Sequence, residues 1–331
     1  MNYLITGITG FAGPHLAKLL LSEGHSVHGV VRGAHGREVE LLDTLSQEEY
    51  DAIEFHYLDL KHYYSIYKLL FEYEEEFDGI FHLAAMSHPP TSFLDPIMTF
   101  EDNVIGSMNL ITAIQEVREH LLYSIKLMFA STSEVYGDTC KDLGILKTTD
   151  ALAPSNPYAC SKAAIDLYLQ ERMRNGFIDG FITRAFSHTG PRRGNKFSIS
   201  SDAYQIAKMK LGLQEKILQV GNLNTERIVI DVRDCVNAYY LLMINKDSNG
   251  KVFNICGTDT HKMQFFTDTL LYLAKLTDVK QQINPKFYRK VDIQVQRGDS
   301  SDLKNLTGWK ANIPTLFTLN DLLSYWLRKL Q

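Results

Sequence analysis

A tyrosine and a lysine four residues apart, Tyr158 and Lys162, form the pair with the clearest chemical potential. This spacing places a phenol and an ammonium group on one helix face. Because a nearby positive charge favours the phenolate, we expect Lys162 to lower the pKa of Tyr158 from about 10 and make it a base near neutral pH. The spacing alone is not diagnostic, since it recurs at Tyr57/Lys61, Tyr64/Lys68, Tyr204/Lys208 and Tyr325/Lys329.

The neighbours of Tyr158 set it apart from the other tyrosines. It follows a Pro154–Pro157 turn that can start a helix, and a hydroxyl-rich strand end lies 26 residues before it, at Thr132. This strand end offers two hydroxyl groups, Thr132 and Ser133, and one carboxylate, Glu134. The alternative reading of Glu134 is an exposed acid at a strand end. The predicted catalytic residues are Thr132, Ser133, Glu134, Tyr158 and Lys162.

Three glycines, Gly7, Gly10 and Gly13, lie between the first apolar run and the first helical pattern. Missing β-carbons let a backbone approach phosphates, and the helix N-terminus offers unpaired N–H groups. A simple turn is the alternative, but the strand-turn-helix context favours a dinucleotide site. We predict contacts from Gly7, Thr9, Gly10, Phe11 and Gly13.

The end of the second strand indicates which dinucleotide binds. An NAD enzyme normally has an acidic residue here, yet Arg32 follows the strand and the next acid is Glu38. Arg32 suits a 2′-phosphate and predicts NADP over NAD, although a surface arginine at a strand end is common. Further predicted cofactor contacts end the third and fourth strands, at Asp59, Leu60, Leu83, Ala84 and Ala85. Asn103 and Gly106 open a later helix, where a cofactor contact and simple capping or packing both stay open.

Short apolar runs alternate with helical patterns along the chain, and the strands and helices that they predict must position the catalytic and cofactor residues. The runs are Tyr3–Thr6, Ser26–Val31, Ile53–Tyr57, Gly79–Leu83, Lys126–Ala130 and Gly180–Arg184. The alternation predicts an α/β fold, a Rossmann doubly wound parallel sheet. The first helix is expected to begin at Pro14 and to end near Gly24.

The pattern of apolar runs and helical stretches changes after Arg184, which predicts a smaller C-terminal α/β substrate-binding lobe. We expect residues 1–184 to form the Rossmann domain, with part of 223–256 returning to it, and residues 185–331 to form mainly the second lobe. Helices are expected at Ser201–Leu213, Gln264–Leu276 and Thr318–Leu330.

Composition excludes several other classes of protein. The chain has 331 residues, 45% of them hydrophobic, with a net charge of −5, which argues against binding nucleic acid or an anionic membrane. No apolar run approaches the roughly 18 residues of a membrane span, and the start lacks a basic leader, so we expect a cytoplasmic protein. The scattered cysteines show no CxxC pair, and neither a metal site nor a disulfide is predicted.

The glycine loop, the segment Ser131–Gly137 and the Tyr158/Lys162 pair together resemble the extended short-chain dehydrogenases, specifically the sugar-nucleotide 4,6-dehydratases, over essentially the whole chain. In that family the tyrosine takes the proton of the 4-hydroxyl while C4 hydride passes to NAD(P)+. The resulting ketone acidifies the C5 proton, which a glutamate at the position of Glu134 removes; water leaves from C6 and the hydride returns there. Ser133 replaces the aspartate of many dTDP-glucose dehydratases, as in GDP-mannose 4,6-dehydratases.

A second resemblance lies in Arg184–Gly194, whose Arg192-Arg193-Gly194 is similar to a dehydratase loop that binds NADP and joins subunits in tetramers. It implies cofactor contacts from His188 and Arg193, with His188 packing the loop rather than acting in catalysis. Ser187 departs from the usual asparagine. The stretches around Arg227 and Arg289 look more like GDP-4-keto-6-deoxymannose reductases, and both guanidinium groups suit a diphosphate, unless they are solvated surface residues. The predicted substrate contacts are Ser87, Ser187, Asn222, Arg227 and Arg289.

These resemblances imply a GDP-hexose 4,6-dehydratase acting on GDP-mannose or GDP-N-acetylglucosamine. The alternatives are a GDP-4-keto-6-deoxyhexose reductase, a sugar-nucleotide epimerase and a non-catalytic NADP-binding regulator. A homodimer or homotetramer is expected, because helices around Asn103–Val117 and Tyr158–Met173 occupy positions that pair across subunits in similar proteins.

Overall fold

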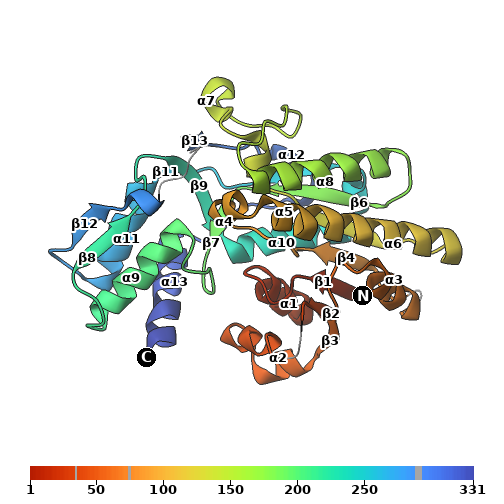
Figure 1. The fold of residues 1–331 in the computed structure, drawn as a ribbon, viewed down its shortest axis with the longest axis horizontal. Helices are drawn as coiled ribbons and strands as arrows, with labels where there is room; N and C mark the ends of the chain where they lie inside the picture. Colours follow the sequence, from red (N-terminus) through yellow and green to blue (C-terminus); the bar gives the residue numbers. More distant parts are fainter. Residues whose placement is uncertain (34–35, 74–75, 288–292) are drawn as a thin grey trace.

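The computed structural model describes residues 1–33, 36–73, 76–287 and 293–331. Its largest element is a seven-stranded sheet in the order β10-β6-β5-β4-β1-β2-β3 (Figure 1). All neighbouring strands run parallel, which confirms the predicted doubly wound sheet. The strands are β1 (Asn2–Thr6), β2 (Ser26–Val31), β3 (Ile53–Tyr57), β4 (Gly79–His82), β5 (Lys126–Ala130), β6 (Gly180–Ala185) and β10 (Val252–Ile255).

The strand order reverses between β1 and β4. The chain runs outward from β1 through β2 to β3, then returns to the other side of β1 and continues outward through β4, β5 and β6. Loops leaving the carboxyl ends of β1 and β4 therefore diverge, and such a switch point is where open α/β sheets bind ligands. Gly7 follows β1 there, and Leu83 follows β4.

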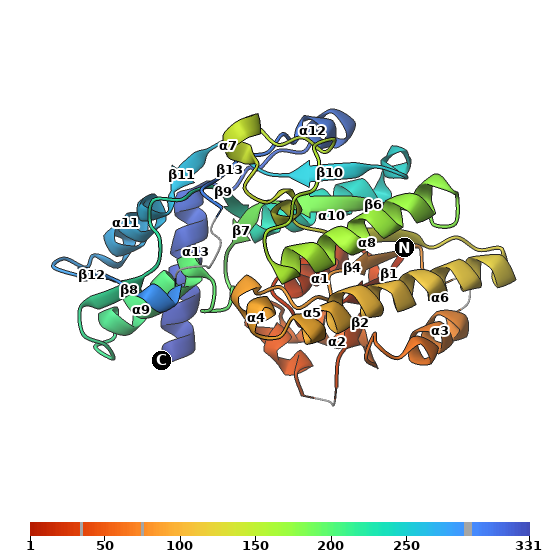
Figure 2. The ribbon, with the colours of Figure 1, turned by 45° about the horizontal axis from the view of Figure 1, so that its top comes forward.

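Helices cover both faces of the sheet because alternate strand residues point to opposite sides. In β1, Tyr3 and Ile5 pack in one apolar cluster and Leu4 packs in another. The first cluster takes in α1 (Gly13–Ser22) and α10 (Val232–Ile244), and the second takes in α3 (Tyr63–Glu72), α6 (Gly106–Leu121) and α8 (Pro157–Arg174), as Figures 1 and 2 show. Pro14 lies in the first turn of α1, as predicted.

The second lobe has its own apolar core. Its helices are α9 (Ser198–Lys210), α11 (Met263–Ala274) and α13 (Thr315–Leu330), which pack on one another. Strand β9 (Glu226–Asp231) pairs with β7 (Ser187–Thr189), β11 (Thr260–Lys262) and β13 (Val295–Gln296), while β8 (Ile217–Val220) pairs with β12 (Lys280–Ile283). Helices α9 and α13 each begin three residues before the predicted start. Their N-cap residues, Phe197 and Pro314, make no capping side-chain hydrogen bond, so the sequence carries no start signal.

The chain returns to the large sheet after β9. Helix α10 packs on α1, and β10 pairs with β6, so residues within 223–256 lie beside the Rossmann strands. The division into domains at residue 184 stays a prediction. In the parts of the chain that the structure describes, no helix has both the length and the apolar character needed to cross a membrane. The shorter helices are α2 (Gln47–Asp51), α4 (Pro89–Leu94), α5 (Pro96–Phe100), α7 (Cys140–Leu143) and α12 (Ser301–Thr307).

Candidate active site

A cavity of about 660 Å³ is lined by the carboxyl ends of the sheet strands and by residues of the second lobe. It gathers residues from most of the chain length. The predicted residues in its wall are Gly7, Gly10, Phe11, Gly13, Leu83, Ala85, Ser87, Thr132, Ser133, Glu134, Tyr158, Lys162, Ser187, His188, Arg193, Asn222 and Arg227.

The glycine loop forms the floor of this cavity. Gly7 has a φ of +74°, and a β-carbon there would lie 2.7 Å from the backbone nitrogen of Ala84. A β-carbon on Gly13 would overlap the backbone of Ile8. The turn therefore has no room for a side chain at these two positions, and its backbone lines the cavity beside the start of α1. This arrangement fits a dinucleotide phosphate.

The catalytic candidates are connected by hydrogen bonds at the end of β5. The hydroxyl of Thr132 accepts a hydrogen bond from the backbone N–H of Glu134 at 3.3 Å, at the start of a short 3-10 turn over Ser133–Tyr136, and it lowers the pKa of the Tyr158 phenol. A carboxylate oxygen of Glu134 accepts a hydrogen bond from the amide of Asn156 at 2.7 Å. Phenol, hydroxyl and carboxylate thus line one cavity in a fixed arrangement.

The predicted lowering of the Tyr158 pKa by Lys162 is wrong for this structure. Burial, and after it the charge of Glu134, raise the pKa of Tyr158 to about 12, and Thr132 and Arg193 only partly oppose this rise. Burial also lowers the pKa of Lys162 to about 7, and its Nζ lies 4.1 Å from the ring centre of Phe129. A lysine that readily loses its charge stabilises a phenolate weakly.

Comparison with known proteins identifies the family. The GDP-mannose 4,6 dehydratase family model matches residues 4–320. The chain belongs to this family. A GDP-6-deoxy-D-mannose reductase from Pseudomonas aeruginosa is 30% identical over 97% of this chain and 96% of its own length. The GDP-mannose 4,6-dehydratase of Vibrio cholerae is 29% identical over 94% of this chain and 89% of its own. The GDP-mannose 4,6-dehydratases are enzymes, and relatives of this chain are named for both the dehydratase and the reductase activity.

Solved structures agree with the fold. The structure of RMD from Pseudomonas aeruginosa complexed with NADPH has a TM-score of 0.80, 27% identity and 99% coverage of both chains. The dTDP-glucose 4,6-dehydratase DesIV from Streptomyces venezuelae, with NAD bound, has a TM-score of 0.84 at 22% identity, covering 99% of this chain and 97% of its own. The second likeness concerns the fold alone.

Some residues predicted to contact the cofactor lie outside the cavity wall. Arg32 extends from the end of β2, and its Nη1 donates to Asp102 at 2.7 Å. The carboxylate of Asp59 accepts a hydrogen bond from the backbone N–H of Lys61, at the end of β3. Thr9, Leu60 and Ala84 also lie outside the wall. Arg289, which was predicted to contact the substrate, lies outside the described residues.

Asn103 holds the loop after β4 through hydrogen bonds to both backbone groups of Met86, which favours its packing role.

The arginine-rich loop closes over the glycine loop. Arg192 donates to the carbonyl of Thr9 at 3.3 Å, and the guanidinium of Arg193 lies 3.5 Å from the ring centre of Phe197. His188 bonds the carbonyl of Phe186 at 3.0 Å and stacks on Phe11, as expected for a loop-packing residue, and burial lowers its pKa to about 4. Its imidazole is therefore neutral at physiological pH.

A buried group of positioning residues behind the cavity was not predicted from the sequence. Arg184 donates to both carboxylate oxygens of Asp166, which also accepts a hydrogen bond from Ser131 at 2.7 Å. Arg184 also donates to the phenol of Tyr136. This buried network joins α8 to the ends of β5 and β6. The one feature of the network that the sequence pattern could have indicated is Asp166, which lies two helical turns after Tyr158 on the same face of α8.

The four other Tyr/Lys pairs do not take part in the cavity wall, as far as the described residues show. Tyr57 donates to Glu38, Tyr64 is 75% exposed, and Tyr325 and Lys329 both contact Asp43. The fourth pair, Tyr204 and Lys208, lies on α9, with the Lys208 ammonium 5.6 Å from the ring centre of Tyr204. The fold thus singles out Tyr158 and Lys162, which spacing alone does not.

Proposed function

We propose that the chain catalyses the 4,6-dehydration of a GDP-hexose, GDP-mannose or GDP-N-acetylglucosamine, to the 4-keto-6-deoxy sugar. The observation that carries this proposal is the carboxylate of Glu134, held by Asn156 in the same cavity wall as Tyr158 and Thr132. Removal of water across C5 and C6 needs a base for the C5 proton, whereas reduction of a ketone does not. A positioned carboxylate therefore favours elimination.

The roles of the side chains follow from their groups. Thr132 binds the 4-oxygen, and Tyr158 takes its proton. The dinucleotide, when bound, supplies the acceptor and later the donor of the hydride. Glu134 removes the C5 proton, and Glu134 or Ser133 protonates the departing 6-hydroxyl. Lys162 interacts electrostatically with Tyr158.

The cofactor of this proposal is NADP. The residues that would hold it are those of the glycine loop, the ends of β3 and β4, and the loop with His188 and Arg193. Arg32 would bind the 2′-phosphate, because it is the cation at the end of β2 and no acidic residue replaces it there. The reductase relative with NADPH bound supports the same choice.

The substrate diphosphate would bind on the second-lobe side of the cavity. Arg227 lies in the wall there, with its guanidinium held by the carbonyls of Glu226 and Ile293, and Asn222 lies in the same wall. A guanidinium fixed in this way is ordered before a phosphate arrives, which lowers the entropic cost of binding. Ser87, Ser187 and Arg289 complete the proposed substrate contacts.

A GDP-4-keto-6-deoxyhexose reductase is the second candidate. The observation in its favour is the 30% identity of the chain to the Pseudomonas aeruginosa reductase over nearly the full length of both proteins. A reductase would consume one NADPH for each sugar, and a dehydratase would consume none.

The deciding experiment is incubation of the purified enzyme with each GDP-hexose and catalytic NADP, without added NADPH. We expect mass spectrometry to detect a product lighter by one water. If no such product forms from either sugar, while a 4-keto-6-deoxy sugar consumes NADPH stoichiometrically, the chain is a reductase.

The variant Glu134→Gln separates the steps. We expect the 4-ketone and reduced cofactor to accumulate in a single turnover, while loss of water slows by roughly 10²–10⁴-fold, because only the second step needs the carboxylate. Tyr158→Phe should block reduction of the cofactor itself, and Tyr64→Phe, at an exposed tyrosine of a similar pair, should change neither step. An elimination rate unaffected by Glu134→Gln would refute the assigned role.

A further inference from the structure

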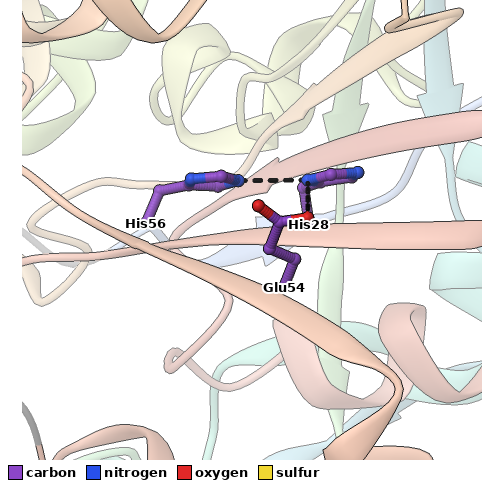
Figure 3. Close-up of side chains that lie close together, drawn as sticks. All are labelled: His28, Glu54 and His56. Atoms are coloured by element: carbon purple, nitrogen blue, oxygen red, sulfur yellow. Dashed lines mark hydrogen bonds and ion pairs between the residues drawn. The ribbon is translucent and has the colours of Figure 1, made fainter. Parts of the chain in front are cut away.

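A cluster of three potential metal ligands lies on the sheet away from the active-site cavity. His28 on β2 and Glu54 and His56 on β3 have ligand atoms that all lie within 4.8 Å of one another (Figure 3). None of the three lines the cavity. The cysteine pattern predicts no metal site, and it does not include these three residues.

Strand register explains why these side chains meet. His28 pairs with Glu54 and Val30 pairs with His56 across the parallel β2–β3 ladder. Residues two apart in a strand share a face, so Glu54 and His56 project to the same side, and His28 projects there from the neighbouring strand. Two ligands from one strand and a third from the next form a rigid set, because the backbone hydrogen bonds fix all three β-carbons.

Two of the three separations between ligand atoms come close to those of a tetrahedral site, and the third is within 4.8 Å. Nδ1 of His28 lies 3.0 Å from Nε2 of His56 and 3.6 Å from Oε2 of Glu54. Ligands about 2.05 Å from zinc at the tetrahedral angle lie about 3.3 Å apart. One observed separation is a few tenths of an ångström shorter and the other a few tenths longer. In the hydrogen bond between the two rings, one nitrogen carries a proton that points at the other nitrogen. A metal would take the place of this proton, which can move to the second nitrogen of the ring that carries it.

A neighbouring tyrosine supports the cluster from one side. The phenol of Tyr73 donates to Oε1 of Glu54 and leaves Oε2 facing His28, which orients the carboxylate. The ring of Tyr73 also contacts both imidazoles edge-on.

Access to the cluster is open. The side chain of His28 is 9% exposed and that of Glu54 is 53% exposed, and β3 is the edge strand of the sheet. A cation can therefore enter from the Glu54 side and keep a water as its fourth ligand. We propose that His28, Glu54 and His56 bind one borderline divalent transition metal, zinc above all, which clamps β3 to β2. Imidazole and carboxylate ligands favour zinc over magnesium or calcium.

The test uses the full chain without a polyhistidine tag and without nucleotide, titrated with Co²⁺ and then Zn²⁺. We expect one Co²⁺ per chain, with the visible absorption of tetrahedral coordination, displaced by one Zn²⁺. His56→Gln and Glu54→Gln should each weaken binding at least tenfold and abolish the rise in Tm that Zn²⁺ produces. His120→Gln, an exposed histidine on α6, should behave as the wild type.

Unchanged NADP(H) binding in the His56→Gln and Glu54→Gln variants would show that both fold. The proposal fails if Co²⁺ gives no tetrahedral spectrum. It also fails if His56→Gln binds the metal as tightly as the wild type, since the metal would then be held elsewhere.

Discussion

Burial sets the protonation states of single residues around the cavity. The pKa of Tyr158 rises to about 12, and the pKa values of Lys162, His188 and Arg193 fall to about 7, 4 and 10. In each case removal from water disfavours the charged form. The proposed base is thus a protonated phenol at neutral pH in this structure, and a positive charge near it would favour its deprotonation.

Arg32 provides a prediction about the cofactor at this scale. Its guanidinium is 56% exposed and bonds Asp102, so it can reorient toward a 2′-phosphate. A hydrogen bond to a charged group contributes about 1.5–3 kcal/mol. We expect Arg32→Ala to weaken NADPH binding roughly 10–100-fold and to leave NADH binding unchanged, as measured by fluorescence titration. Arg174→Ala, on the exposed end of α8, serves as the control. Equal losses for both cofactors would contradict the role.

At the scale of elements, Asn156 connects the start of α8 to the active-site turn. Its side-chain oxygen caps the helix by accepting from the N–H of Ala159 at 2.8 Å, and its amide donates to Glu134. Both functions meet in one side chain, so the position of the helix and the position of the carboxylate are linked. Tyr158 lies in the first turn of the same helix.

Two substitutions separate these functions. Asn156→Ser keeps a good cap and loses the amide donor, so we expect unchanged stability to urea and a kcat lowered about tenfold or more. Asn156→Ala loses both, and should also destabilise the fold by about 1 kcal/mol. If the serine variant keeps full activity, the contact with Glu134 does not matter for catalysis.

Asp202 joins α9 to α11 and makes stability depend on pH. It accepts a hydrogen bond from Thr267 at 2.7 Å, and burial raises its pKa to about 7 from an ordinary value of 3.8. Between these values the folded state holds a proton that the unfolded state has lost. The contribution of Asp202 to stability therefore falls as pH rises from about 4 to 7, by up to about 1.4 kcal/mol per pH unit.

We expect Asp202→Asn to remove this dependence and to be more stable than the wild type at pH 8. Urea unfolding at pH 5 and pH 8 measures the difference. The exposed Asp268→Asn should follow the wild type at both pH values. A pH dependence that Asp202→Asn leaves intact would mean that the carboxyl group is ionised in the folded protein.

At the scale of the whole molecule, one surface carries a run of exposed apolar side chains. Leu94, Ile97, Phe100, Ile105 and Met108 are each more than a third exposed, along α4, α5, the residues between α5 and α6, and the start of α6. Helices α4, α5 and α6 contact α8, and these four helices lie on one side of the sheet (Figure 2). Burial of this surface by a second copy of the chain is consistent with the predicted homo-oligomer.

A charge introduced on this surface should prevent the predicted assembly. Ile97 is 73% exposed, and Ile97→Asp should convert the oligomer to a monomer in light scattering at micromolar concentration, because an interface would bury the carboxylate. Tyr272→Asp, at a tyrosine 78% exposed on α11, should leave the assembly unchanged. A wild-type monomer at that concentration would contradict the prediction of an oligomer.

Local spacing determined much of this protein from its sequence. The glycine loop, the hydroxyl-rich segment with Glu134 and the alternation of strands and helices all depend on residues close together in the chain. Their conformations follow from neighbouring residues, so the parallel sheet, the family and part of the cavity wall were predictable. The contacts of Arg32 and Asp59, which lie outside the wall, were not. The starts of α9 and α13 were not, because no capping side chain marks them.

Only the tertiary structure decided the features that depend on burial and on distant partners. It raised the pKa of Tyr158, which the nearby lysine alone would lower. It joined Arg184 to Asp166 and Asn156 to Glu134, and it aligned His28 with Glu54 and His56 through the register of two strands. Desolvation and contacts across the sheet produce these effects, and neither can be read from spacing along the chain.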